Sequence, residues 1–497
     1  MNDSTLADWS ARAEALVIEG RAFVNGTYRA ALSAGTFECL SPIDGRCLAT
    51  VASCDEADVN DAVANARQVF DSGAWARLAP AQRKRTLLRF AGLMRAHAEE
   101  LALLETLDMG KPISDALGVD LEGAIDAITW SAEAIDKIYD EVAPTPHHEL
   151  GLVTREPVGV VAAIVPWNFP LMMACWKLGP ALATGNCVVL KPSEKSPLTA
   201  IRIAQLAVAA GLPAGVLNVL PGYGHTAGKA LALHADVDTV VFTGSTRIAK
   251  QLLCYAGESN MKRVWLEAGG KSPNIVFADA PDLRAAAEAA ATAIAFNQGE
   301  VCTAGSRLLV EASIKDTFLP MVVEALKQWR VGNPLDPQTR VGALVDRQQL
   351  DTVLSYIEAG HAEGAQLLIG GAQILDETGG IYVQPTLFDG VTNAMKIARE
   401  EIFGPVLSVI AFTSTQEAID IANDTQYGLG AAVWTRDLSK ALLTSKALRA
   451  GSVWINQYQG GDMTAPFGGY KQSGNGRDRS LHAFDKYTEL KATWIKL

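Results

Sequence analysis

The sequence predicts an α/β protein built from two successive series of parallel strands and helices. From residue 158 onward, short apolar runs rich in β-branched residues alternate with amphipathic stretches of helical length. Strands that alternate with helices in this way form βαβ units around a mainly parallel sheet. At 497 residues the chain is also too long for one hydrophobic core, so two or three domains are expected.

The first series supplies four strands joined by helices. Its strands are expected at 158–164, 187–190, 216–219 and 239–242, with helices near 171–184, 197–210, 225–234 and 246–256. Two earlier helical stretches, 56–70 and 81–107, are expected to cover one face of this sheet. The segment before them, which holds Cys39, Cys47 and Cys54, is interpreted as irregular.

The second series begins after Gly269-Gly270, which is a credible domain boundary. Its expected elements are strands at 275–277, 307–310, 406–412 and 431–434, with helices at 282–296 and 313–329. The final stretch, 487–497, alternates enough to form a strand.

Composition and charge exclude several classes of function. Lys and Arg number 43 against 55 Asp and Glu, a net charge of −12 that argues against non-specific binding to nucleic acid or an anionic membrane. The longest apolar run, 158–165, is far shorter than the roughly 20 residues of a membrane span. Met1-Asn2-Asp3-Ser4 has no basic or apolar leader character, and the seven cysteines show no pairing pattern. We therefore expect a cytoplasmic protein.

Cys302 is the cysteine whose neighbours favour reactivity. It follows the polar turn Phe296-Asn297-Gln298-Gly299-Glu300-Val301 at the end of an Ala-rich helix, where a thiol can be exposed. By contrast, Cys175, Cys187 and Cys254 lie among apolar residues, where a cysteine is usually a small buried hydrophobe.

Glu267 is a candidate base for that thiol. It ends the first series, just before Gly269-Gly270, whereas Cys302 belongs to the second. The two residues are therefore expected on facing edges of a cleft between domains, which is a favoured position for a ligand site.

A set of motifs in order along the chain resembles the aldehyde dehydrogenase superfamily. They are Pro166-Trp167-Asn168-Phe169-Pro170, Lys191-Pro192-Ser193-Glu194, Phe242-Thr243-Gly244-Ser245-Thr246, the Glu267 and Cys302 segments, Glu400-Glu401-Ile402-Phe403-Gly404-Pro405 and Pro466-Phe467-Gly468-Gly469. The resemblance implies a Rossmann-like NAD-binding domain (1–140 and 160–270), an α/β catalytic domain (271–478) and a small β oligomerisation element (141–159 and 479–497). It also implies a homotetramer built as a dimer of dimers.

The catalytic roles implied by this resemblance fall on Cys302, Glu267 and Asn168. A thiolate attacks the aldehyde, hydride passes to a nicotinamide, and the resulting thioester is hydrolysed. A thiol with a pKa near about 8.5 needs a base, and Glu267 can serve the thiol and later the hydrolytic water. The Asn168 amide and the backbone N–H of Cys302 would hold the oxyanion.

The cofactor signal is a strand-to-helix turn without the Gly-x-Gly-x-x-Gly motif. Gly244 and Ser245 open a helix whose N–H groups can receive a pyrophosphate. By resemblance, further cofactor contacts are Trp167, Lys191, Glu194, Glu401 and Phe403. Because Glu194 would repel a 2′-phosphate, NAD is expected and NADP is less favoured. Ala249 departs from the family's usual Gly. No metal site is expected.

Details of the sequence resemble the γ-glutamyl-γ-aminobutyraldehyde and ω-aminoaldehyde dehydrogenases. These are Ala268, where the family usually has Leu, the Asp462-Met463-Thr464 run, and the tail from 468 to 490. The expected substrate is a small aldehyde such as γ-glutamylamino-, amino- or guanidino-butyraldehyde in polyamine catabolism. The expected substrate-binding residues are Phe169, Trp176, Phe296, Tyr458, Asp462 and Phe467, with Asp462 pairing a cationic ω-group.

Four alternatives stay open. The chain could be a broad-specificity aliphatic dehydrogenase, or a betaine or semialdehyde dehydrogenase. A CoA-acylating relative would typically lack the carboxylate of Glu267, so its presence favours hydrolysis. A non-catalytic structural protein on the same fold would not need Cys302, Glu267 and Asn168 together.

Overall fold

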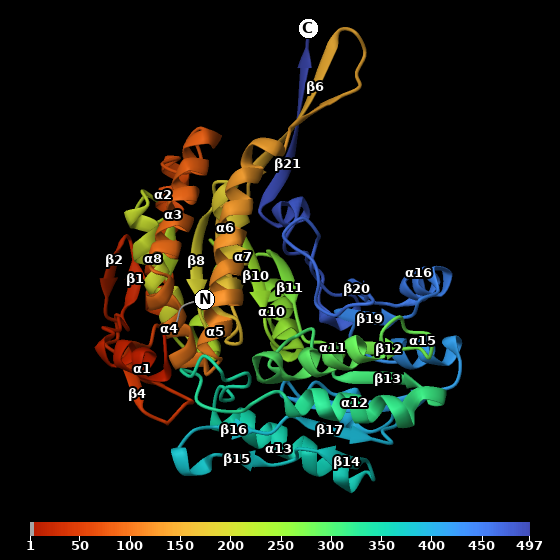
Figure 1. The fold of residues 1–497 in the computed structure, drawn as a ribbon. Coiled ribbons are helices and arrows are strands. Elements are labelled where there is room, and N and C mark those ends of the chain that lie inside the picture. Colours follow the sequence, from red (N-terminus) through yellow and green to blue (C-terminus); the bar gives the residue numbers. More distant parts are fainter. Residues whose placement is uncertain (1–3) are drawn as a thin grey trace.

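Two seven-stranded sheets organise the chain, and a three-stranded sheet projects from them (Figure 1). The computed structural model describes residues 4–497; Met1 to Asp3, part of the N-terminus considered above, lie outside the described residues. The α/β fold class is confirmed. Each predicted strand and helix is present with ends displaced by no more than a few residues, except that the helix expected at 81–107 is divided at His97.

The first sheet has five parallel strands and an antiparallel hairpin at one edge. Across the sheet the order is β11 (Arg263–Glu267), β10 (Thr239–Thr243), β7 (Val160–Ile164), β8 (Cys187–Lys191), β9 (Leu217–Val219), β1 (Ala22–Val24) and β2 (Thr27–Arg29). From β7 the chain adds β8 and β9 on one side, then returns to add β10 and β11 on the other. The loop after β7 thus lies where the strand order reverses, which is the usual ligand position in such sheets.

Helices cover both faces of this sheet, and its central strands are accordingly buried along their whole length and mostly apolar. On one face lie α3 (Pro80–Ala96), α6 (Glu122–Ala134), α7 (Pro170–Ala183) and α8 (Leu198–Ala209). On the other lie α2 (Glu56–Ser72), α9 (Lys229–Leu233) and α10 (Thr246–Glu258). Beyond these, α1 (Leu6–Ala15) and α4 (Ala98–Met109) form a smaller apolar cluster.

The second sheet is parallel except for one edge strand. Its order is β14 (Gln366–Ile369), β17 (Thr386–Asp389), β18 (Val406–Phe412), β13 (Arg307–Glu311), β12 (Pro273–Val276), β19 (Gly430–Trp434) and β20 (Ser452–Ile455). The helices of this half are α11 (Leu283–Ala295), α12 (Lys315–Lys327), α13 (Arg347–Ala362), α14 (Lys396–Arg399), α15 (Thr415–Asn423) and α16 (Leu438–Ala447).

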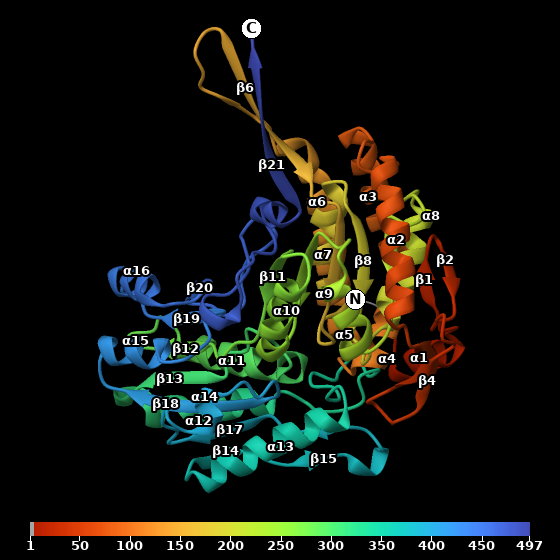
Figure 2. The same cartoon turned by 180° about the vertical axis from the view of Figure 1, so that it is seen from behind.

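A ribbon of antiparallel strands extends away from both sheets (Figures 1 and 2). It consists of β5 (Glu141–Ala143), β6 (Glu149–Pro157) and β21 (Thr488–Lys496), with β6 in the centre. The predicted C-terminal strand therefore exists, and its partner is an element of the same chain.

Two interpretations of the cysteine environment were wrong. The segment expected to be irregular holds a hairpin of β3 (Thr36–Leu40) and β4 (Cys47–Ala52), because alternating residues of β3 are buried. Cys254, expected among buried apolar residues, is exposed on α10, whereas Cys175 and Cys187 are buried. All seven cysteines are free thiols.

The two large sheets face each other end to end. Glu267 is the last residue of β11, and only five residues separate it from Pro273, the first residue of β12. The carboxyl ends of the strands in the first sheet therefore meet the amino ends of the strands in the second. The loops that lead into β13 and β18 lie at this junction.

Arg307 anchors the second sheet beside this junction. Its fully buried guanidinium donates to the Lys271 carbonyl at 3.0 Å, to Asn393 Oδ1 at 3.0 Å, and to the carbonyls of Ile421 and Ala422 at 2.8 Å. The last two are carbonyls at the end of α15, which have no partner within the helix. One side chain thus joins β13, the end of α15 and the segment that leads from Glu267.

We predict that Arg307→Met lowers the free energy of unfolding by about 3 kcal/mol or more, because four buried acceptors lose a charged donor. Thermal unfolding at a fixed scan rate should show a lower Tm. The matched control is Arg436→Met, which removes an exposed arginine that also donates to backbone carbonyls, at Asp279 and Ala280. Equal losses in the two variants would contradict the role of burial.

Candidate active site

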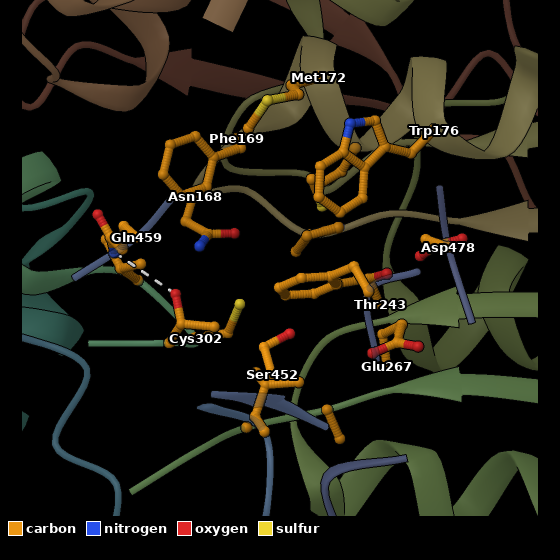
Figure 3. Close-up of a pocket in the computed structure, with 18 of the residues that line it drawn as sticks. Asn168, Phe169, Met172, Trp176, Thr243, Glu267, Cys302, Ser452, Gln459 and Asp478 are labelled. Atoms are coloured by element: carbon orange, nitrogen blue, oxygen red, sulfur yellow. Dashed lines mark hydrogen bonds between the residues drawn. The ribbon is translucent and has the colours of Figure 1, made fainter. Parts of the chain in front are cut away.

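A cavity of about 740 Å³ opens between the facing ends of the two sheets. This size is typical of sites for small molecules and cofactors. It is lined by twelve of the residues predicted from the sequence: Trp167, Asn168, Phe169, Trp176, Gly244, Ser245, Glu267, Phe296, Cys302, Glu401, Phe403 and Phe467. Figure 3 shows the part of it around Cys302.

The turn that carries Cys302 is held in an unusual backbone conformation. Asn297 and Gln298 have φ of +49° and +57°, in the left-handed region that non-glycine residues seldom adopt. Gln298 Oε1 accepts from the Gly342 N–H at 3.1 Å, and Glu300 Oε1 accepts from the Val345 N–H at 3.1 Å. Buried side-chain bonds thus fix the turn, as expected where backbone strain is retained at a site.

The Cys302 thiol is half-buried and faces the cavity (Figure 3). Burial, together with the nearby carboxylates of Glu401 and Glu267, raises its pKa to about 12, against the opposing effect of the backbone N–H groups of Thr303 and Cys302. The resting thiol is therefore protonated at neutral pH. Attack requires a base or a change in the local charge.

Asn168 lies in the loop after β7, with its amide beside the Cys302 thiol (Figure 3). Its Nδ2 donates to the Glu300 carbonyl at 2.8 Å. The backbone carbonyl of Asn168 accepts hydrogen bonds from Lys111 Nζ at 3.0 Å and from Asn297 Nδ2 at 3.1 Å. The amide is thus fixed against the turn that carries Cys302, which preorganises a donor as stabilisation of an oxyanion requires.

Glu267 lies further along the cavity, beside Thr243 and Asp478 (Figure 3). Neither of its carboxylate oxygens has a hydrogen-bond partner within residues 4–497, so it makes no direct bond to Cys302. Burial raises its pKa well above the usual value, and the charge of Asp478 adds to this; Lys177, Lys486 and Arg477 oppose it. A carboxyl group with a raised pKa is suited to proton transfer near neutral pH.

Asp478 is the carboxylate behind Glu267. It is fully buried and bonded to both Lys177 and Lys486, which keep its pKa below the usual value despite burial. No sequence motif pointed to this cluster, since its three members come from α7 and from two places near the C-terminus.

The start of α10 fits the pyrophosphate of a dinucleotide. Ser245 is the N-cap of this helix, and its hydroxyl accepts from the Ile248 N–H at 3.4 Å. The Thr243 hydroxyl beside it is buried without a partner in the described chain, and so is available to a ligand. Ala249, which departs from the expected Gly, is buried in the first turns without displacing the helix.

Lys191, the last residue of β8, lies together with Glu194 in the loop that follows, as predicted. Lys191 Nζ is 3.2 Å from Glu194 Oε2 and donates to the Pro192 carbonyl at 2.9 Å. Glu194 keeps about a third of its side chain exposed. These residues do not line the cavity around Cys302, so they suit a more distant part of a long cofactor, such as the adenosine ribose.

Glu401 and Phe403 enter the cavity from the loop before β18. Glu401 Oε1 accepts from the Gly270 N–H at 3.0 Å, and burial raises its pKa to about 7. Phe403 has φ of +57° and packs edge-on against Trp167 at 5.2 Å between ring centres. The site can therefore hold a nicotinamide ribose and ring beside Cys302, and the residues fit NAD.

Aromatic rings form the remaining wall. Phe169 stacks on Phe296 at 6.2 Å, and Trp176 packs edge-on against Phe467 at 5.3 Å. Tyr458 and Asp462 were also predicted to contact substrate, but neither lines the cavity. The Tyr458 hydroxyl donates to the Thr303 carbonyl at 2.7 Å and supports the Cys302 turn from behind.

Asp462 is exposed, and its carboxylate accepts from the Thr464 N–H at 2.8 Å. That short-range bond is typical of an Asx-turn. The sequence interpretation expected Asp462 to pair with a cationic ω-group of the substrate, but Asp462 is not among the residues that line the cavity. The cavity instead includes residues that no motif indicated, among them Val119, Met172, Gln459 and Arg479.

Two further surveys cover the described chain. Within residues 4–497, no group of three or more His, Cys, Asp and Glu side chains is arranged to hold a metal ion. None of the helices in this range has the length and apolarity needed to cross a membrane.

Comparison with known proteins decides the family. The aldehyde dehydrogenase family model matches residues 28–493. The chain belongs to the aldehyde dehydrogenase family. It is an NAD(P)-dependent aldehyde dehydrogenase, and the resemblance drawn from its motifs is confirmed.

Among similar proteins, this aldehyde dehydrogenase is 58% identical to the NADP/NAD-dependent aldehyde dehydrogenase PuuC of Escherichia coli, over the whole of both chains. It is 78% identical to a solved mutant of P. syringae AldA indole-3-acetaldehyde dehydrogenase in complex with NAD+ and IAA, with a TM-score of 0.99 over 99% of this chain and 100% of that one. The γ-glutamyl-γ-aminobutyraldehyde dehydrogenase of Burkholderia cenocepacia is 63% identical, with a TM-score of 0.98 and the same coverage.

The unpaired, buried carboxyl group of Glu267 gives a prediction about stability. Because its pKa is raised in the folded chain, its favourable contribution is fully present below the usual value of 4.5 and is lost as the pH rises toward the folded-state pKa. We predict that Glu267→Gln raises the Tm by roughly 1 to 3 °C at pH 8, and by much less at pH 5.

The measurement is a series of thermal scans from pH 5 to pH 8. Glu258→Gln, at an exposed position in α10, is the control and should show no gain that grows with pH. A Tm difference for Glu267→Gln that stays constant across this range would mean that the Glu267 carboxyl group ionises normally in the folded protein.

Proposed function

We propose that this NAD(P)-dependent aldehyde dehydrogenase oxidises small ω-substituted aldehydes, such as γ-glutamylamino-, amino- or guanidino-butyraldehyde, to carboxylic acids in polyamine catabolism. The observation that carries the proposal is the placement of Cys302, Asn168 and Glu267 around one cavity whose outer wall is aromatic. The names of the relatives from E. coli and B. cenocepacia support the substrate class.

Cys302 and Asn168 each have one task in the proposed reaction, and Glu267 has two. Glu267 takes the proton of the Cys302 thiol and passes it to solvent, and the thiolate attacks the aldehyde carbon while the Asn168 amide and a backbone N–H hold the oxyanion of the thiohemiacetal. NAD, held by Glu401, Phe403 and the start of α10, would supply the hydride acceptor. Glu267 then takes a proton from water as it attacks the thioester, which releases the acid and restores the thiol. The carboxylate of Glu267 supports hydrolysis over transfer to CoA.

Glu267 is suited to serve two steps because no residue in the range 4–497 forms a hydrogen bond with its carboxylate, so the side chain is not committed to one orientation. The ion pairs of Asp478 with Lys177 and Lys486 lie behind it as a fixed set of charges.

Oxidation of an arylacetaldehyde is a second candidate, favoured by the stacked Phe169 and Phe296 and by the pair of Trp176 and Phe467. A planar aromatic substrate would fit between such rings. The relative from P. syringae, named indole-3-acetaldehyde dehydrogenase, supports this second candidate.

We also propose a homotetramer in which the ribbon of β5, β6 and β21 is the oligomerisation element. The proposed NAD-binding domain spans 1–140 and 160–270, and the proposed catalytic domain spans 271–478. The exposed apolar side chains of Leu490 and Trp494 on β21 support a partner there. We propose a cytoplasmic location.

A substrate panel tests the proposed function. With NAD, we expect kcat/KM for the ω-substituted butyraldehydes to exceed that for butyraldehyde by about tenfold or more, since polar groups contribute discrimination that a plain chain lacks. NADH formation is measured, indole-3-acetaldehyde is included, and Cys302→Ala should abolish turnover. If butyraldehyde or indole-3-acetaldehyde is the best substrate, the proposed substrate class is wrong.

Cofactor choice provides a separate prediction. Glu194 is a like charge to the 2′-phosphate of NADP, so NAD should have the higher kcat/KM, and Glu194→Gln should shift the ratio toward NADP by about tenfold. Lys191, 3.2 Å away, limits the preference. The ratio is measured with one aldehyde at saturation. An unchanged ratio in Glu194→Gln would place its carboxylate away from the ribose.

A further inference from the structure

A half-buried arginine, Arg479, lines the cavity beside its aromatic wall. Its guanidinium carbon lies 5.6 Å from the centre of the Trp176 ring, and Trp176 in turn packs against Phe467. A positive charge is therefore present on the wall that we assign to the substrate chain. It was not anticipated, since the sequence interpretation placed residue 479 in the oligomerisation element.

No acidic side chain of the described residues neutralises Arg479 by direct contact. The adjacent Asp478 is bonded to Lys177 and Lys486 instead. Asp462 acts on Arg479 only at longer range, and its carboxylate is already bonded to Thr464. The Nε of Arg479 is buried and has no hydrogen-bond partner among residues 4–497. An unsatisfied buried donor is costly, so this position favours an acceptor supplied from the cavity.

The backbone at Arg479 is fixed in a strained conformation. Arg479 and Ser480 have φ of +62° and +50°, both in the left-handed region. The segment is held on either side, because Asp478 and Phe467 exchange two backbone hydrogen bonds of 2.7 and 2.8 Å, and the Ser480 N–H donates to the Met463 carbonyl at 2.8 Å. The fold thus sets the direction of the Arg479 side chain at a cost, as is common at functional positions.

We propose that Arg479 selects aldehydes whose far end carries a carboxylate, so that the γ-glutamylamino aldehyde is preferred to the free amino and guanidino aldehydes. This inference rests on the proposed function, and chooses among the substrates given there. The cation of Arg479 repels an ammonium or guanidinium group, whereas its planar fork can bind a carboxylate through two hydrogen bonds.

The charges near Arg479 also fit the second charged group of the same substrate. A γ-glutamyl group ends in an α-carboxylate and an α-ammonium group. Asp462 is exposed and Arg479 is half-buried, and the two charges interact. The pair thus offers an anion and a cation to the two charges of the zwitterion. The predicted pairing of Asp462 with an ammonium group is retained as part of this proposal.

The test compares two non-reactive amides as competitive inhibitors of propionaldehyde oxidation in the presence of NAD. γ-Glutamyl-n-butylamide carries the zwitterion, and N-butylacetamide shares only the amide and the chain. We expect the wild type to bind the first about tenfold or more tightly than the second, which corresponds to about 1.4 kcal/mol. Arg479→Met should remove most of this ratio, and Arg479→Lys should retain part of it.

Both replacements are long and unbranched and carry the same backbone strain as arginine, so their folding should be comparable. Arg449→Met is the matched control, since Arg449 is exposed and lies over the Tyr470 ring, 5.8 Å from its centre, outside the cavity lining. It should keep the wild-type ratio. Equal inhibition constants for the two amides in the wild type, or an unchanged ratio in Arg479→Met, would overturn the proposal.

Turnover of γ-glutamylaminobutyraldehyde is measured separately, so that the two proposals can fail independently. Tight, Arg479-dependent binding of the γ-glutamyl amide supports the inference even if this aldehyde is not oxidised, a result that would refute the proposed substrate. Suppose that γ-glutamylaminobutyraldehyde is oxidised efficiently, and that Arg479→Met lowers its kcat/KM no more than that of N-acetylaminobutyraldehyde. This result would refute the inference and leave the proposed function in place.

Discussion

The close approach of Gly270 to the backbone of Cys302 is the constraint on which the site depends. A side chain at Gly270 would collide with the Cys302 carbonyl, and one at Gly269 would collide with the Glu401 carboxylate. Glycine is thus required by close packing at the crossing between the sheets. Because the crossing is so tight, the loops after β11, before β13 and before β18 converge within one cavity.

The close packing at this crossing also explains the raised pKa values of the acidic groups in the site. Cys302, Glu267 and Glu401 are acidic groups that line the same cavity, and burial raises the pKa of each. Burial of several like-charged groups would be unfavourable if all were ionised, so the resting site holds protons that the reaction can move. Asp478, by contrast, forms ion pairs with two lysines, which keep it ionised. The structure therefore separates groups that exchange protons from one that stays charged.

Sequence alone was sufficient where burial or local chemistry dominates. Parallel strands such as β7 and β18 are covered on both faces, so their apolar runs are continuous and easily recognised. The motifs around Asn168, Glu267 and Cys302 were placed in one cavity as expected. The β3 hairpin was missed because its alternation spans only five residues. The turn formed by Asp462 and Thr464 was readable from their spacing, whereas the position of Arg479 depends on long-range bonds from Phe467 and Met463 that no local pattern encodes.

The ribbon has a consequence for the order of events during synthesis. Thr488 pairs with Pro157 and Lys496 with Glu149, so β6 must wait for almost the entire remaining chain before its partner exists. Both large sheets can form from residues already released by the ribosome, but the ribbon closes only after β21 has been released. A chain that stops short of β21 would leave β6 with an open edge and exposed backbone groups, a recognised cause of aggregation. Release of β21 is in this way coupled to protection of the free edge of β6.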